Sequence, residues 1–355
     1  MEIPLHPPYP SLTVVIATHD NRALLFQALD GLSRQTKTPA AEFDVVVVAD
    51  GCNDGTVAAL REVSTAFELT VIENVRSGLA AARNRGLAQA RGEVVLFLDD
   101  DVVARSGLIA EHARLQSTSP NRVVLGQVTT ARESRTSWDA YDDAMRDKRQ
   151  RALSTTEQPS GIHSAGNVSI RRDLLIAADG FRGYLPGNQE VELGYRLREL
   201  GAEFVFSPEA SAEDRGSSDY RSWSKQHSMR GRLDVATYKQ NPDGQGIDQL
   251  LACFYQRHPL GRALVATLLR WRTLTSAALW WAGLSGVIAH RLGLAAVSRA
   301  AYSAVANTLY WSGVRDALRG NAAFFPMLKA AKGAAGLVRP RIVGRRDPKA
   351  AVIEG

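Results

Sequence analysis

The residues best suited to chemistry are three consecutive aspartates, Asp99, Asp100 and Asp101. Carboxylates this close repel one another, so a bound cation would stabilise their charged forms. Mg2+ and Mn2+ prefer such oxygen ligands and often bind phosphate oxygens at the same time. Because side chains alternate along an extended segment, Asp99 and Asp101 should point one way and Asp100 the other. An acidic turn that binds nothing is the alternative.

The elements around the triplet alternate between strands and helices. Apolar runs at 12–17, 43–49, 69–72 and 94–98 predict buried strands, and the helices expected between them cover 22–35, 56–67 and 78–90. This order predicts a parallel sheet, whose ligands bind at the carboxyl ends of its strands. Thr18, Asp50 and the aspartate triplet stand at such ends, so we expect them to share one site.

The first strand is followed neither by a Walker-type phosphate loop nor by a dinucleotide glycine fingerprint. P-loop enzymes and dehydrogenases are therefore excluded. A nucleoside diphosphate could still be held by a metal and an arginine. Arg83 and Arg85 both lie early in the helix expected over 78–90, where they cannot face the same partner, and Arg83 is the candidate.

A possible general base follows later in the chain. Residues 132–162 are polar and predict a loop or short helix, 168–170 and 204–206 predict short strands, and a helix over 189–200 should begin after Asn188 as N-cap. Glu190 lies in the first turn of that helix, where the helix dipole favours the ionised carboxylate that a base needs. The alternative is that Glu190 only stabilises the start of the helix by interacting with the helix dipole. Glu192 should face solvent or pair with Arg196.

Seven short segments in fixed order carry a recognisable pattern: 14–18 (VVIAT), 47–56 (VVADGCNDGT), 78–86 (GLAAARNRG), 97–101 (FLDDD), 166–172 (GNVSIRR), 179–181 (DGF) and 189–197 (QEVELGYRL). Through these segments, residues 11–235 resemble the family 2 glycosyltransferases. The resemblance implies a GT-A fold: an α/β, Rossmann-like, mixed but mostly parallel sheet flanked by helices, here with a C-terminal helical appendage. It also implies an inverting, Mg2+- or Mn2+-dependent enzyme that moves a sugar from a nucleotide-sugar donor to a hydroxyl of a glycan or lipid-linked acceptor. Polysaccharide, glycolipid or other glycoconjugate synthesis is the expected setting.

The same resemblance implies roles for individual residues. These are Thr18 and Asp50 for the nucleoside, Arg83 for the diphosphate side, Asp99 for ribose or a metal-bound water, Asp100 for the donor site, Asp101 for the metal and Glu190 for the catalytic base. In a direct displacement the acceptor hydroxyl loses its proton to a carboxylate as it attacks.

Two segments depart from the family pattern. Gln189-Glu190 stands where Glu-Asp is usual, which alters the reach of the base. Many members carry a histidine where this chain reads Ala212-Glu213-Asp214-Arg215-Gly216, so Asp214 could replace it as a metal ligand. Nearby His227 is expected to be an ordinary helix residue, and Cys52 a small buried one. Two other functions stay open. One is a sugar nucleotidyltransferase, which would need a glycine-rich basic loop after the first strand. The other is a non-catalytic domain that binds nucleotide sugar or membrane.

The net charge of +6 averages two unlike regions. Residues 1–250 carry 28 Lys/Arg and 34 Asp/Glu, whereas 251–355 carry 15 and 3. We expect a glycosyltransferase domain over 1–255, with a nucleotide half at about 11–130 and an acceptor half at about 131–235. After this domain we expect a helical region at 256–335 that could associate with a membrane. A basic flexible tail at 336–355 should end the sequence. Two cysteines exclude a disulfide scaffold and suggest a reducing compartment.

The basic region interleaves arginine with tryptophan and leucine, as suits the interface of an anionic membrane. A helical cap packed on the catalytic domain is the alternative. Residues 273–290 lack charge but are short and polar for a spanning helix, which favours a surface-lying helix or a buried helical pair. No nucleic-acid-binding module accompanies the charge, so no nucleic-acid partner is expected. The N-terminus lacks the features of a secretory signal, so the expected location is cytoplasmic or peripheral on the cytoplasmic face of a membrane.

Overall fold

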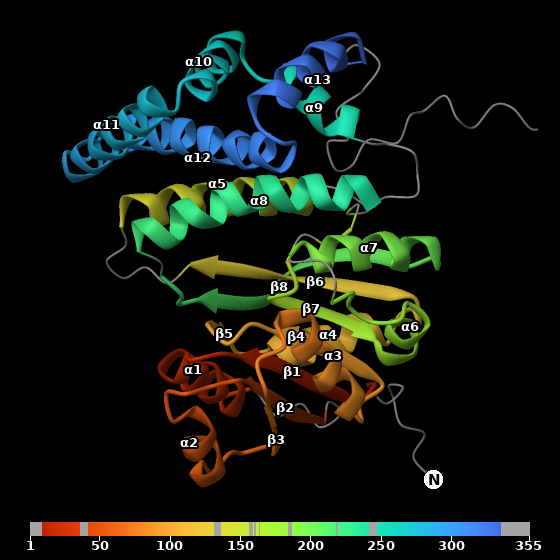
Figure 1. Cartoon of the computed structure of the whole chain (residues 1–355). Helices are drawn as coiled ribbons and strands as arrows, with labels where there is room; N and C mark the ends of the chain where they lie inside the picture. The colour runs from red at the N-terminus through yellow and green to blue at the C-terminus, as the bar shows by residue number, and fades with distance from the viewer. Residues whose placement is uncertain are drawn as a thin grey trace, which may run out of the picture.

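The structure is a computed structural model that describes residues 9–35, 42–130, 136–155, 159, 161–162, 164–183, 187–217, 219–240 and 247–334. The basic tail expected at 336–355 lies outside these ranges. Figure 1 shows a sheet with helices on both faces, and a helical layer stacked beyond one end of the sheet. The layer comprises α5 (Ser137–Ser154), α8 (Tyr220–Gln240) and all later helices, so it includes residues well before 256.

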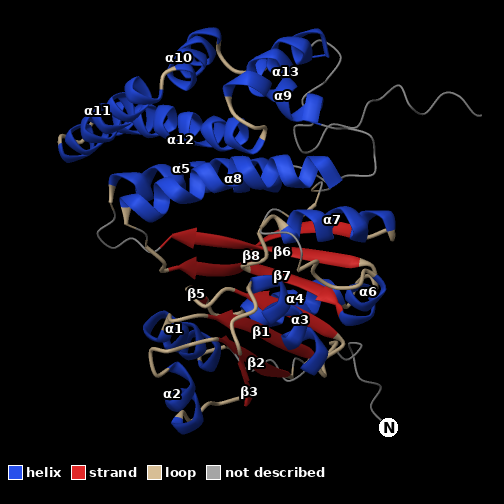
Figure 2. Cartoon of the chain, viewed as in Figure 1, coloured by secondary structure: helices blue, strands red, loops and turns tan. Residues whose placement is uncertain are grey.

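The sheet has eight strands in the order β3-β2-β1-β4-β7-β6-β8-β5. Strands β3, β2, β1 and β4 are parallel, and so are β6 and β8, whereas β7 runs antiparallel to both β4 and β6, and β5 antiparallel to β8. The strands are β1 (Leu12–Thr18), β2 (Phe43–Asp50), β3 (Glu68–Asn74), β4 (Val94–Leu98), β5 (Val102–Ala104), β6 (Arg122–Thr130), β7 (Asn167–Arg171) and β8 (Glu203–Asp214). The expected mixed, mostly parallel sheet is confirmed (Figure 2).

Successive valines of β2 enter two different cores. Val46 and Val48 pack with helices α3, α6 and α7, whereas Val45 and Val47 pack with α1, α2 and α4. A strand buried on both faces must be apolar at every position, which explains the continuous valine run. The helices are α1 (Arg22–Ser33), α2 (Thr56–Glu62), α3 (Leu79–Gln89), α4 (Leu108–Gln116), α6 (Arg172–Ala177) and α7 (Gln189–Glu199).

One expectation for the middle of the chain is wrong. Residues expected to form a loop or short helix contain α5 (Ser137–Ser154), a helix of 18 residues. A reciprocal capping box begins it: the Thr136 hydroxyl accepts from the backbone of Asp139, whose carboxylate accepts from the backbone of Thr136. Tyr141 then packs against Trp223 of α8, so tertiary burial stabilises a helix whose composition is strongly polar.

Two further boundaries differ from expectation by several residues. Helix α2 ends at Glu62 rather than 67, and β8 runs on to Asp214 rather than ending near 206. Pairing between β8 and β6 continues across a register irregularity at Gly126/Gln127, which no local pattern reveals. Asn188 is the N-cap residue of α7, as expected, but it has a left-handed conformation with φ 56° and its side chain makes no cap hydrogen bond. It donates instead to Asp234 of α8.

Helices form the rest of the described chain, as expected for 257–332. They are α8 (Tyr220–Gln240), α9 (Ile247–Tyr255), α10 (Pro259–Arg270), α11 (Arg272–Arg291), α12 (Ala295–Ala317) and α13 (Asn321–Ala334). Helix α12 lies between α8 and α11 (Figure 1). Gly231 of α8 faces the Tyr310 carbonyl and Gly313 of α12 faces the Ser228 carbonyl, and a Cβ at either would stand 2.0 Å or less from that oxygen. The two glycines therefore allow the backbones of α8 and α12 to approach this closely.

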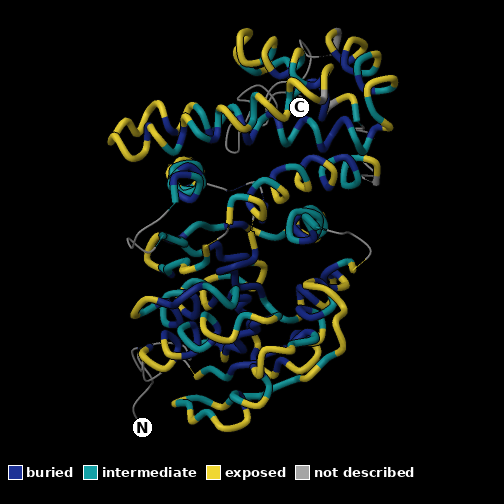
Figure 3. Tube along the Cα trace, turned by 60° about the vertical axis from the view of Figure 1, so that its left-hand side comes forward, coloured by how far each residue is buried: buried dark blue, intermediate teal, exposed yellow. Residues whose placement is uncertain are grey.

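Exposed residues are frequent along the outer helices, α10 to α12, and scarce along the strands of the sheet (Figure 3). The exposed residues of these helices include large apolar ones. Trp280 and Trp281 of α11 are 61% and 64% exposed. Within the described ranges, no helix combines the length and apolar character needed to cross a bilayer. Helix α11 packs along α12.

Candidate active site

The carboxyl ends of β1 and β4 bring two expected site residues into contact. The Thr18 hydroxyl donates a 2.6 Å hydrogen bond to Oδ2 of Asp100. Burial raises the pKa of Asp100 against the opposing effect of that bond. Asp100 is thereby held toward β1, on a different side from its neighbours Asp99 and Asp101, which line a cleft.

Asp50, at the end of β2, organises the turn that leads into α3. Its Oδ1 accepts from the backbone and hydroxyl of Ser77 and from the Asn74 amide, and its Oδ2 accepts from the backbone of Gly78. Burial raises the pKa of Asp50, but these hydrogen bonds outweigh it and hold the value below normal. Asp50 is thus a fixed, ionised acceptor at the sheet edge.

Arg83 is buried and points at the triplet. Its Nη2 lies 2.9 Å from Oδ1 of Asp99, and its guanidinium stands 5.4 Å from the centre of the Phe181 ring. Its buried Nη1 has no hydrogen-bond partner among the described residues. Arg85, on the same helix, is exposed. The structure therefore separates the two arginines as their spacing predicts, and pairs Arg83 with Asp99.

Asp101 and Asp214 lie close together, and the Asp214 carboxylate disfavours the ionised form of Asp101. Burial, and then the carboxylates of Asp214, Asp99 and Asp100, raise the pKa of Asp101 to about 7. Asp214 reaches this position because the last residue of β8 pairs with Val102 of β5. A Cβ on Gly216 would stand 2.3 Å from Oδ2 of Asp101 and 3.1 Å from Oδ1 of Asp214. Any side chain at position 216 would fill the space between these carboxylates, and glycine leaves it open. A hard divalent cation fits such a space, because it binds clustered carboxylate oxygens.

Glu190 faces the same space. It lies in the first turn of α7 and lines a cleft of 670 Å³ together with Asp99, Asp101 and Asp214. Within the described ranges no hydrogen bond or ion pair engages its carboxylate. Glu192, by contrast, forms ion pairs with Arg196 at 2.6 Å and with Arg182 at 3.2 Å. The pair with Arg196 is one of the two alternatives expected for Glu192. Of the two acids, Glu190 is the one available to a ligand.

Helices α5, α8 and α12 close the cleft on the side away from β1. They contribute Arg146, Arg149, Arg230, Asp234 and Tyr310. Sequence reasoning missed all five, and the polar stretch around Arg146 was expected to be a loop or short helix. The available signal was the helical i, i+3 spacing of Arg146 and Arg149. His227 is a buried helix residue as expected, 3.5 Å from Asp142.

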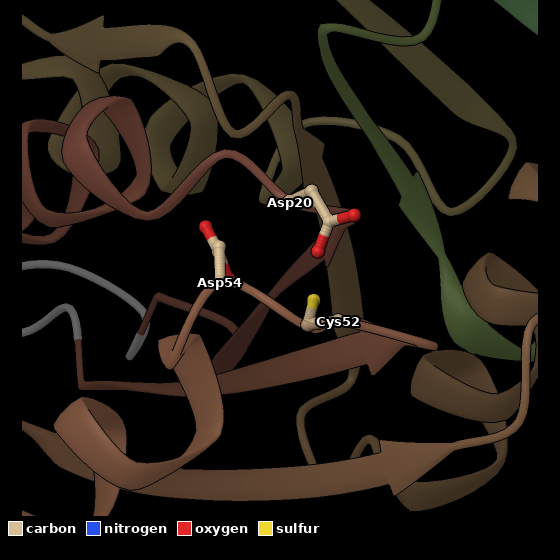
Figure 4. A group of neighbouring side chains, drawn as sticks. All are labelled: Asp20, Cys52 and Asp54. Atoms are coloured by element: carbon tan, nitrogen blue, oxygen red, sulfur yellow. The ribbon is translucent and has the colours of Figure 1, made fainter.

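A second group of potential ligand atoms lies in the loops after β1 and β2. Side-chain atoms of Asp20, Cys52 and Asp54 come within 4.8 Å of one another and face a common space (Figure 4). Asp20 accepts from the backbone of Asn53, and Asp54 accepts from the backbones of Arg22 and Thr56. Through these hydrogen bonds both carboxylates stabilise the loops, which explains their presence without a metal. Cys52 is half-buried rather than buried.

Comparison with known proteins places the chain in a family. Residues 13–184 match the family model for glycosyl transferase family 2. An uncharacterized glycosyltransferase, YfnE of Bacillus subtilis, is 34% identical over 116 residues, which cover 32% of this chain and 29% of that protein. Glycosyltransferase AglE of Haloferax volcanii is 25% identical over 201 residues, covering 56% and 64%. The matched segments thus span less than two thirds of each relative's length.

The fold is shared with a solved mannosyltransferase, PcManGT from Pyrobaculum calidifontis, determined in complex with GDP-Man and Mn2+. The two are 19% identical and superpose with a TM-score of 0.53 over 85% of this chain and 88% of that one. Residues 13–184 belong to glycosyltransferase family 2, and the chain has the GT-A fold.

Proposed function

We propose that the chain is an inverting, divalent-metal-dependent glycosyltransferase that transfers a sugar from a nucleotide-sugar donor to a hydroxyl of a glycan or lipid-linked acceptor. The observation that carries the proposal is the shared cleft of Glu190, Asp99, Asp101 and Asp214. The complex of PcManGT with GDP-Man and Mn2+ supports the donor class and the metal.

The donor would bind along the carboxyl ends of β1, β2 and β4. Thr18 and the fixed carboxylate of Asp50 suit the nucleoside, with Asp100 locked behind Thr18. Arg83 would lie on the diphosphate side and keeps Asp99 oriented through their ion pair. Asp101 and Asp214, with Asp99 beside them, would hold the cation, which when bound neutralises charge on the departing diphosphate.

Glu190 would act as the general base. Its carboxylate takes the proton of the acceptor hydroxyl as that oxygen attacks the anomeric carbon. The bond from the anomeric carbon to the diphosphate oxygen breaks in the same step, so the configuration at the carbon inverts. Its position in the first turn of α7 favours the ionised form that this role requires.

A nucleotide-sugar panel with Mn2+ or Mg2+ tests the proposal. Asp101→Asn should weaken donor binding, whereas Glu190→Gln should keep donor binding and lose transfer by at least about a hundredfold. Glu199→Gln, an exposed acid on the same helix, is the matched control and should behave as wild type. Transfer by Glu190→Gln at the wild-type rate would refute the base assignment.

Two other outcomes would favour other functions. Pyrophosphate release from a nucleoside triphosphate and a sugar 1-phosphate would identify a nucleotidyltransferase. Donor binding without turnover on any glycan acceptor, and without hydrolysis, would favour a non-catalytic domain.

We also propose that the outer helices dock on an anionic membrane surface. The apolar side chains exposed there are Leu260, Leu264, Trp271, Leu274, Trp280, Trp281, Ile288, Leu292, Leu294 and Val297. Residues 249–315 contain no Asp or Glu, so the face is apolar and purely basic, which complements anionic headgroups. Tryptophan and arginine together suit the bilayer interface.

Vesicle flotation of the full chain tests this docking. The chain should float with phosphatidylglycerol vesicles, less so with phosphatidylcholine, and Trp280→Ser/Trp281→Ser should reduce flotation severalfold. Val75→Ser, an exposed apolar residue of the nucleotide half, is the control. Failure of the full chain to float with anionic vesicles would refute the docking.

A further inference from the structure

Three arginines project into the cleft from the helices that cover it. Arg146 and Arg149 come from α5, Arg230 comes from α8, and all three line the cleft with Glu190. The donor residues Thr18 and Asp50 belong to β1 and β2, at the opposite end of the sheet from β6 and β8, on which α5 packs (Figure 1). The arginines therefore border the part of the cleft left for the acceptor.

Only one of the three has a close carboxylate partner. Nη2 of Arg146 lies 2.6 Å from Oδ2 of Asp214, and its buried Nη1 has no hydrogen-bond partner in the described chain. Within the same ranges, no carboxylate lies within 4.0 Å of a guanidinium nitrogen of Arg149 or Arg230. Both side chains are accessible to a ligand that enters the cleft.

This arrangement is costly without a counterion. The walls of the cleft desolvate Arg149, and the charges of Arg230 and Arg146 add to that effect, so the pKa of Arg149 is lowered although Asp142 partly offsets it. Like charges gathered along one wall of a cleft attract an anion, because the cleft focuses their field.

We propose that Arg149 and Arg230 bind a phosphoryl group carried by the acceptor, close to the hydroxyl that Glu190 deprotonates. A phosphoryl group fits better than a single carboxylate, because it offers three oxygens and up to two charges to guanidinium forks that arrive from two helices. The proposal rests on the proposed function and narrows its acceptor to phosphate-bearing molecules.

Binding measurements with two probes test the site. The full chain is titrated with glycerol phosphate, with glycerol as the uncharged comparison, and separately with nucleoside diphosphates in the presence of Mn2+. The variant Arg149→Gln/Arg230→Gln should bind glycerol phosphate about tenfold more weakly or worse and keep wild-type affinity for the nucleoside diphosphate. Arg151→Gln/Arg221→Gln, exposed arginines of the same helices, is the matched control.

Several outcomes would overturn the proposal. Equal glycerol phosphate binding by wild type and the double variant, or equal binding of glycerol and glycerol phosphate, would remove the anion site. A parallel loss of nucleoside diphosphate affinity would assign the arginines to the donor. Failure of wild type to bind any nucleoside diphosphate would instead refute the proposed function, which keeps the two failures distinguishable.

Discussion

Asp214 carries its carboxylate to the side of Asp101 because β8 ends in register with the first residue of β5. Two carboxylates that are remote in the chain thus meet at the edge of the cleft, with Gly216 between them. Their repulsion is part of what raises the pKa of Asp101 to about 7, so the pair is poised to accept a cation.

Replacement of Asp101 should stabilise the metal-free protein. A carboxyl whose pKa is higher in the folded than in the unfolded chain contributes most stability when protonated, and that contribution is lost as pH rises from 3.8 to about 7. Asp101→Asn should therefore raise the melting temperature in EDTA by several degrees at about pH 8 and by less at about pH 5. Thermal unfolding at both pH values measures this. A lower melting temperature of the variant at the higher pH would contradict the environment assigned to Asp101.

Gly216→Ala should weaken divalent-cation binding by about tenfold. The new methyl would stand 2.3 Å from Oδ2 of Asp101, so the carboxylates must move apart. Titration of Mn2+ followed by calorimetry measures the change. Gly183→Ala is the control, because no atom of the described residues lies within 4 Å of its Cβ position. Unchanged Mn2+ affinity of Gly216→Ala would separate this glycine from the metal site.

Arg83→Met should lower the free energy of unfolding by about 1–3 kcal/mol, because the variant removes the buried partner of Asp99 and leaves that carboxylate unpaired. Arg85→Met, an exposed change on the same helix, should alter it by less than about 0.5 kcal/mol. Urea denaturation of the two variants measures the difference. Equal effects would show that the Arg83–Asp99 pair does not stabilise the fold.

His112 should make stability pH-dependent in mildly acidic solution. It is buried between Asn167 and Ser169, and burial lowers its pKa from 6.5 to about 4, so the folded chain holds the neutral ring. Nε2 carries the proton, because the Asn167 amide already donates elsewhere and its oxygen must accept. A lowered pKa means that stability falls as pH drops from 6.5 toward 4, by up to about 3 kcal/mol.

Chemical unfolding at about pH 4.5 and 7.5, compared between wild type and His112→Gln, measures that contribution. The variant should be less stable at the higher pH but lose less stability on acidification. An identical pH dependence of the two proteins would show that His112 is not the titrating group.

Much of the donor half follows from local pattern. The apolar runs of β1, β2 and β4 can be satisfied only by strands buried on both faces, and a parallel arrangement necessarily gathers Thr18, Asp50 and the triplet at one edge. The position of Glu190 in the first turn of α7 is likewise readable, because amphipathic spacing orients that helix. The split between buried Arg83 and exposed Arg85 follows from the same geometry.

The acceptor side depends on contacts that no local pattern contains. The reach of β8 to Asp214 requires pairing with β6 across an irregularity, and the polar helix α5 depends on aromatic packing against α8. Both are stabilised by residues far away in the chain, so the arginine-lined cover of the cleft exists only once the helices have packed on the sheet. Composition alone determined a negative and a positive region, but tertiary packing decided that three cationic side chains would face the carboxylates of the site, because only long-range burial holds them there.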